Sequence, residues 1–144
     1  MRSEIVTADR EFFVSYKIHH IHIKSADPRA SADWFMAAFG FTQVSDEVRV
    51  FSDRFIRLQD ASGLMIIVSG PRAGEDLQPV ATEPHLGLEH LALQTADLDG
   101  DIARLVDLGG KLIDGPEELP GGLRIAFLLS PCNVRLELLQ PPAA

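Results

Sequence analysis

Two stretches decide the fold, "HHIHIKSAD" at residues 19–27 and "EHLALQTAD" at residues 89–97. In each stretch a histidine opens a run in which apolar residues recur at every second position, and an Ala-Asp pair closes it. This period of two predicts a half-buried β-strand. Asp27 followed by Pro28 is typical of a helix N-terminus. The chain is therefore predicted to form a strand and then a helix twice, with histidines where each strand begins.

A shift of 70 residues aligns the two halves of the chain without a gap. Identical residues then fall on strand starts, helix caps, helix ends and strand ends. The pairs are His20 and His90, Ala26 and Ala96, Asp27 and Asp97, Gly40 and Gly110, Arg54 and Arg124, Leu58 and Leu128, and Pro71 and Pro141. Self-similarity at a fixed spacing indicates a duplicated structural unit.

Each half continues with the same predicted elements. The first helix follows Asp27 and ends at Gly40, and the second follows Asp97 and ends at the Gly109–Gly110 pair. Three strands follow each helix, at about 41–47, 50–59 and 63–70, and at about 111–114, 122–130 and 133–140. The order is βαβββ twice, an α+β fold. Because one such unit leaves a sheet face uncovered, we expect the two to pair around a shared concavity.

The predicted organisation is one structural domain with four segments. These are an N-terminal arm at 1–16, a first module at 17–71, a linker rich in proline and charge at 72–86, and a second module at 87–142. A length of 144 residues suits a single core.

Composition excludes several classes of partner. The net charge of −8 without a basic cluster argues against nucleic acid. No apolar run approaches the roughly 18 residues that span a bilayer, so we expect no membrane partner. The lone Cys132 cannot form an intrachain disulfide, which favours a reducing cytoplasm.

The period of two assigns faces to the side chains. His20 and His22 share one face of the first strand, while Ile21 and Ile23 lie on the other face and pack against the helix. His90 takes the position of His20 in the second half. In the last strand, "NVRLELLQ" at 133–140, Leu136 and Leu138 point inward, so Arg135 and Glu137 face the concavity.

Two imidazoles and one carboxylate can hold a divalent metal ion and leave coordination positions open. We therefore predict His20, His90 and Glu137 as metal ligands, with the apolar Ile67 at the fourth equivalent position. Ligation requires the donor atoms to converge within about 3–3.5 Å of one another. The alternatives are strand histidines satisfied elsewhere and a Glu137 salt bridge. His22 is predicted to contact substrate or act as acid or base, whereas His19 and His85 receive no role.

These residues resemble the vicinal-oxygen-chelate superfamily, which includes glyoxalase I, methylmalonyl-CoA epimerase, extradiol dioxygenases and bleomycin-resistance proteins. The resemblance rests on "HHIHIKSADPRASADWFMAAFGF", "GLEHLALQTADLDGDIARLVDLGGKLID" and "GGLRIAFLLSPCNVRLELLQP". It implies that the two tandem modules form a cup-shaped half-barrel around a divalent metal, whose identity among Fe, Mn, Co, Ni and Zn stays open. It also implies a homodimer, in some members with exchanged modules.

The resemblance implies more than one reaction. Glyoxalase I and the epimerase use a fourth ligand where Ile67 stands, yet "KLIDGPEELPGGLRIAFLLS" resembles the epimerase, which makes Asp53 a candidate base. We expect a lyase or isomerase that stabilises an enolate of a small oxygen-rich substrate.

The three-ligand set also resembles that of Fe(II) extradiol dioxygenases. Those enzymes usually have a tyrosine upstream of the ligand glutamate, at the position of Phe127 in this chain, so the resemblance implies that Phe127 contacts the substrate. Fosfomycin transferases share the three ligands, but their phosphonate-binding residues have no match in "LLQPPAA". A metal-free small-molecule binder of the bleomycin-resistance type is the non-catalytic alternative. Arg135 is expected to hold an anionic substrate group or to orient Glu137.

Overall fold

The structure is a computed structural model, and it describes residues 16–144. The predicted arm at 1–16 therefore lies, apart from its last residue, outside the described residues. The elements are β1 (His20–Lys24), α1 (Pro28–Phe39), β2 (Thr42–Val48), β3 (Arg54–Gln59), β4 (Met65–Ser69), β5 (Leu91–Gln94), α2 (Leu98–Asp107), β6 (Lys111–Glu118), β7 (Arg124–Leu129) and β8 (Arg135–Gln140).

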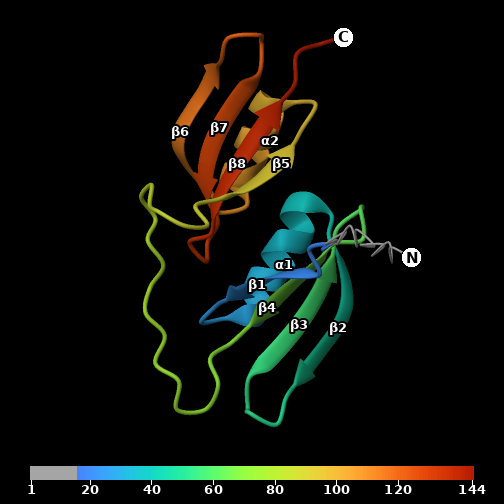
Figure 1. The fold of residues 1–144 in the computed structure, drawn as a ribbon, viewed down its shortest axis with the longest axis vertical. Coiled ribbons are helices and arrows are strands. Elements are labelled where there is room, and N and C mark those ends of the chain that lie inside the picture. Colours follow the sequence, from blue (N-terminus) through green and yellow to red (C-terminus); the bar gives the residue numbers. More distant parts are fainter. Residues whose placement is uncertain (1–15) are drawn as a thin grey trace, which may run out of the picture.

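The predicted βαβββ order occurs twice. The strands form two separate four-stranded sheets, in the orders β1-β4-β3-β2 and β5-β8-β7-β6. In each sheet the first strand pairs in parallel with the last strand of its module, and the other pairs are antiparallel. Figure 1 shows the two modules one above the other, with the segment between β4 and β5 running along one side. The α+β architecture of two tandem modules is thus confirmed.

Both helices begin and end where the capping signals predict. The Asp27 carboxylate accepts a hydrogen bond from the Ala30 amide, and the Asp97 carboxylate accepts one from the Gly100 amide. Gly40 ends α1 in the left-handed conformation with φ of 68°, which residues with a Cβ adopt at a cost. No helix among residues 16–144 is long and apolar enough to cross a membrane.

Two strands differ from the prediction. β3 begins at Arg54 rather than near residue 50, because a turn occupies the residues before it. β6 runs to Glu118 rather than ending near residue 114. Its pairing with β7 shifts register twice, between Leu112 and Asp114 and again between Asp114 and Glu117. These irregularities absorb Gly115 and Pro116, residues that normally end a regular strand, and pairing then resumes. The turn signal at Gly115 and Pro116 therefore does not end β6.

The buried side chains of both modules form one continuous core. Its members come from the helix-covered side of each sheet and from the helices themselves: Ile23, Ala32, Trp34, Phe35, Ala38, Ile56, Leu58, Ile66, Val68, Leu98, Ile102, Leu105, Ala126, Leu128, Leu136 and Leu138. At about 25 cal/mol per Å² of buried apolar surface, this shared core is the main source of stability. The opposite sheet faces, which carry the histidines, are left outside it.

Hydrogen bonds between the helix ends reinforce the contact between modules. Trp34 Nε1 donates to the Leu108 carbonyl over 3.0 Å. Arg104 Nη2 donates to the Ala38 carbonyl over 2.8 Å, at the C-terminus of α1 where carbonyl groups lack helical partners. The two modules are thus joined through their helix sides.

Candidate functional site

The second module brings together two of the three predicted ligands. His90 immediately precedes β5, and Glu137 lies in the neighbouring parallel strand β8, where it is in register with Ala92. His90 Nε2 and Glu137 Oε2 are 3.1 Å apart, and both side chains are more than two-thirds buried. An imidazole nitrogen and a carboxylate oxygen are suitable donors for a divalent cation, and they are close enough to share one.

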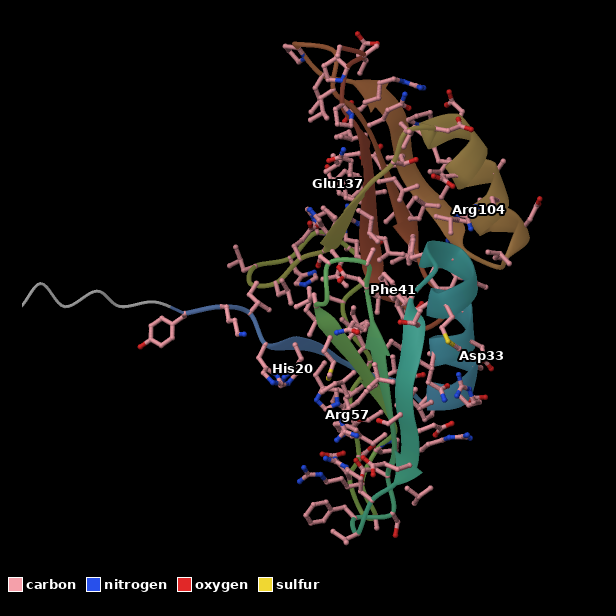
Figure 2. The ribbon with its side chains drawn as sticks, turned by 90° about the vertical axis from the view of Figure 1, so that its right-hand side faces the viewer. His20, Asp33, Phe41, Arg57, Arg104 and Glu137 are labelled. Atoms are coloured by element: carbon pink, nitrogen blue, oxygen red, sulfur yellow. The ribbon has the colours of Figure 1, made fainter. Side chains whose placement is uncertain are left out.

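His20, the third predicted ligand, lies on the first module. Figure 2 shows His20 and Glu137 on different modules, well apart along the molecule. Among residues 16–144, no group of three or more His, Cys, Asp or Glu side chains could hold a metal ion. The predicted convergence of all three ligands within one chain is therefore not observed. The physical reason is that the modules meet through their helix sides, so their histidine-bearing faces do not enclose a common hollow.

Glu89 and Arg135 surround the other side of His90. The Glu89 carboxylate contacts His90 Nδ1, and Arg135 Nε lies 2.6 Å from the second oxygen of Glu89. The hydrogen bond with His90, and then the positive charge of Arg135, lower the pKa of Glu89. Arg135 thus forms an ion pair with Glu89. The predicted role of Arg135 in orienting Glu137 stays a prediction. Its alternative role, holding an anionic substrate group, stays a prediction.

Phe127 lies beside this group. Its ring centroid is 5.3 Å from that of His90, and the Arg135 guanidinium carbon lies 4.8 Å from the Phe127 ring centroid. The ring therefore forms an apolar wall next to the two donors. This location is compatible with the predicted contact to substrate, which stays a prediction.

Two contacts next to the predicted histidine ligands do not follow from the strand pattern, one made by Glu89 and one by His19. His19 Nδ1 and His20 Nδ1 are 2.8 Å apart, so the residue before each predicted histidine ligand contacts its Nδ1 atom. The alternation of side chains along a strand places the residue before a histidine on the other face of the sheet, away from that histidine. This alternation applies only inside a strand. His19 and Glu89 precede β1 and β5. Their equivalence under the 70-residue shift is the signal that could have revealed them.

His85 has different surroundings. Its ring nitrogens lie within hydrogen-bonding distance of the Glu83 and Leu88 carbonyls, in the segment that links the modules. Those backbone hydrogen bonds raise its pKa.

His22 lies two residues along β1 from His20. Its Nε2 atom is 2.8 Å from Ser69 Oγ, and its ring meets Phe55 edge-on with centroids 5.5 Å apart. Partial burial lowers the pKa of His22, and the positive charges of Lys24, His20 and Arg49 lower it further. The imidazole is therefore mostly neutral near pH 7, and its acid–base or substrate-contacting role stays a prediction.

Asp53, the candidate base, lies just before β3 in a buried position. Its side chain is fully buried and receives bonds from Arg49 Nη2 over 2.5 Å and Arg49 Nε over 3.2 Å. The hydrogen bonds from Arg49 lower the pKa of Asp53. A buried, ion-paired carboxylate with a lowered pKa is a poor proton acceptor and cannot reach a substrate. These surroundings argue against Asp53 as a base and favour a structural role.

Ile67 occupies the position equivalent to Glu137. It is buried in β4, in register with His22 on one side and Arg57 on the other. An aliphatic side chain cannot ligate a metal. The first module therefore offers one predicted ligand and the second offers two.

Comparison with known proteins agrees with this architecture. The family described as "Glyoxalase/Bleomycin resistance protein/Dioxygenase superfamily" matches residues 17–138. A glyoxylase/bleomycin resistance protein/dioxygenase domain from Frankia sp. EAN1pec has a TM-score of 0.73 at 20% identity, covering 91% of this chain and 96% of that one. No curated protein matches the chain.

Two further structures show the breadth of the similarity. TnmS3, an antibiotic binding protein from Streptomyces sp. CB03234, has a TM-score of 0.63 at 26% identity, covering 88% of this chain and 97% of that one. A glyoxalase I mutant from Zea mays has a TM-score of 0.71 at 19% identity, covering 90% of this chain and 46% of that one. With the repeated βαβββ order and a family match over most of its length, the chain belongs to the Glyoxalase/Bleomycin resistance protein/Dioxygenase superfamily.

Proposed function

We propose that this protein is a divalent-metal-dependent enzyme of the vicinal-oxygen-chelate type, a glyoxalase- or epimerase-like lyase or isomerase. Its substrate is a small, oxygen-rich organic molecule. The observation that supports the proposal is the 3.1 Å approach of His90 Nε2 to Glu137 Oε2, with Phe127 beside the pair. These donors suit Fe, Mn, Co, Ni or Zn.

The chemistry depends on charge at one oxygen of the substrate. A divalent cation, when bound, supplies positive charge that stabilises the oxygen anion of an enolate. His90 and Glu137 hold the cation, and Phe127 keeps water from one side of the site. His22, on the same face of β1 as His20, is the residue to which we assign substrate contact or proton transfer.

We further propose that the protein is a homodimer and that His20 of a second copy completes the ligand set. Two observations support this arrangement. One chain separates His20 from the other donors. Apolar side chains at equivalent positions before the two predicted histidine ligands, Tyr16 and Ile18 in the first module and Leu86 and Leu88 in the second, are 73–100% exposed. Large apolar side chains this exposed are typical of a surface that a partner covers.

Metal analysis tests the ligand assignment. Purified wild-type protein should contain about one divalent metal ion per chain, and Glu137→Ala should lose most of it because one donor is removed. Glu117→Ala, which removes an exposed glutamate from the same module, is the matched control and should retain the metal. Equal metal content in wild type and Glu137→Ala would contradict the assignment.

Reaction class is decided by two assays on the metal-loaded protein. Exchange of the proton on a carbon next to a carbonyl, without oxygen uptake, is the expected result for a lyase or isomerase. Oxygen consumption with catechols and Fe(II) would instead identify the extradiol dioxygenase.

Mixing two inactive variants tests whether the site is shared between copies. His20→Ala and Glu137→Ala should each bind metal poorly. In a dimer with shared sites, unfolding and refolding them together should restore roughly a quarter of the wild-type sites, because half of the dimers would be mixed and each mixed dimer would hold one intact site. No recovery, with dimers present, would refute the shared site.

A non-catalytic small-molecule binder is the second candidate. TnmS3, described as an antibiotic binding protein, is 26% identical to this chain, which favours it. Wild-type protein that binds aromatic antibiotics and takes up no metal would establish this function and refute the enzymatic one.

A further inference from the structure

We infer that Glu89 is a positioning residue for the proposed metal site, and that Arg135 acts through it. The inference rests on the proposed function, because it concerns how His90 presents Nε2 to a cation shared with Glu137. Its basis is a row of contacts through the second module: Arg135 Nε to Glu89, Glu89 to His90 Nδ1, and His90 Nε2 to Glu137.

Neutral imidazole carries its proton on either nitrogen, and only the bare nitrogen can bind a metal. The Glu89 carboxylate accepts a hydrogen bond, so it favours the tautomer in which His90 Nδ1 carries the proton. The lone pair is then on Nε2, the atom nearest to Glu137. A carboxylate at the distal nitrogen also makes the histidine a more basic ligand.

Arg135 fixes Glu89 in turn. Its side chain is only 9% exposed, it lies 2.6 Å from Glu89 Oε1, and its Nη1 donates to the Thr82 carbonyl over 3.3 Å. Phe127 lies next to its guanidinium group. Because the Thr82 carbonyl and the Phe127 ring hold the guanidinium in place, its positive charge attracts the Glu89 carboxylate and keeps it next to His90 Nδ1.

The first module has a related arrangement. His19 Nδ1 contacts His20 Nδ1. The residue before the predicted ligand thus again contacts Nδ1, which leaves Nε2 of His20 as the nitrogen that would bind the metal. The recurrence of this contact at equivalent positions supports a positioning role in the second module. A neutral imidazole is a weaker acceptor than a carboxylate, so Glu89 is the residue for which we expect the larger effect.

The test is metal affinity, measured by calorimetric titration of Zn²⁺ into the chelator-treated full-length protein. Glu89→Ala should weaken binding by about 10–100-fold, the usual effect of removing a group that orients a metal-binding histidine. Glu89→Gln keeps an acceptor oxygen and should recover part of that loss. Glu117→Ala is the control and should bind Zn²⁺ like wild type. If Glu89→Ala also retains wild-type affinity, the inference is wrong.

Two further measurements separate positioning from general damage. In imidazole ¹⁵N spectra of the zinc-loaded protein, His90 should have its proton on Nδ1, and in Glu89→Ala a share of the protein should have the other nitrogen ligating. Arg135→Ala should weaken binding in the wild type but add little to Glu89→Ala, because its effect passes through Glu89. Fully additive losses would contradict this order.

The outcomes distinguish the inference from the proposed function. Loss of Zn²⁺ in Glu137→Ala with no change in Glu89→Ala refutes the positioning role and leaves the metal site standing. Unchanged binding in Glu137→Ala refutes the metal site, and the positioning role with it.

Discussion

The two modules share one topology but differ on the sheet faces that carry the histidines. In the second module, His90 and Glu137 lie in contact, and Glu89 and Arg135 hold the far side of the imidazole. In the first module, the polar side-chain contact of His20 within residues 16–144 is with the imidazole of His19, and Ile67 stands where a carboxylate would complete a pair. The two modules therefore have the same backbone arrangement. The pair of donor side chains, His90 and Glu137, lies in the second module.

The difference extends to the cations on the first sheet. Arg49 and Arg57 lie over the ring of Phe55, with guanidinium carbons 3.8 and 4.7 Å from its centroid. Asp53 and Glu47 neutralise these arginines. Asp53 and Glu47 of the first module thus pair with arginines, whereas Glu137 and Glu89 of the second module contact a histidine, and Glu89 contacts Arg135 as well.

The largest expected effect comes from truncating core side chains, and it tests whether the two modules contribute equally to the stability of the shared core. Leu58→Ala and Leu128→Ala remove equivalent, fully buried side chains, so each should lower the free energy of unfolding by about 2–5 kcal/mol. Because the core is continuous, urea unfolding should remain a single transition in both variants. Two transitions, or a marked effect of only one variant, would show that the modules unfold separately.

The contact between modules should contribute less. Arg104→Ala removes hydrogen bonds to the carbonyls of Ala37 and Ala38 and should lower the free energy of unfolding by about 1–2 kcal/mol, since the side chain is partly exposed. Arg124→Ala is the matched control. It breaks an exposed ion pair with Asp99 inside one module, so chemical denaturation should show a change below about 1 kcal/mol. Equal losses would mean that Arg104 does not join the modules.

The helix caps allow a finer comparison. Asp27→Ala and Asp97→Ala each remove one capping hydrogen bond and should cost about 1 kcal/mol of stability. The loss should be slightly greater for Asp27, because α2 retains Asp99 and Asp101 in its first turn and α1 has no acidic residue there. A larger loss for Asp97, measured by thermal unfolding, would contradict this reasoning.

The last expected effect is a pH dependence that we assign mainly to one ion-paired carboxylate of the first module. Hydrogen bonds from Arg54 and then Arg29 lower the pKa of Asp46 from 3.8 to about 2. Since the folded-state pKa lies below the unfolded one, this stabilisation is present above about pH 4 and is lost as the pH falls towards 2. The equivalent position in the second module is Pro116.

Asp46→Asn should flatten the acid limb of the stability–pH curve over that window. Asp99→Asn, in a more exposed ion pair, should change the curve less. An unchanged acid limb in Asp46→Asn would rule out this ion pair as the source.

Much of this protein followed from the sequence because the deciding signals are local. Strand alternation around Ile21 and Ile23, and the capping signals at Asp27 and Gly40, depend on neighbours within a few residues, and the structure bears them out. The 70-residue repeat predicted the second module in the same way. The β6 bulges escaped prediction because pairing with β7 outweighs the local preference of Gly115 and Pro116 to end a strand.

Only the tertiary structure decided which side chains meet. The burial of Asp53, the contact of Glu89 with His90, and the separation of His20 from Glu137 all depend on how segments distant in the chain pack together. The sequence by itself determined two equivalent sheet-and-helix modules with histidines at their first strands. Their assembly through the helix sides follows from burying one common apolar core, and that packing left a pair of donors where the sequence had predicted three.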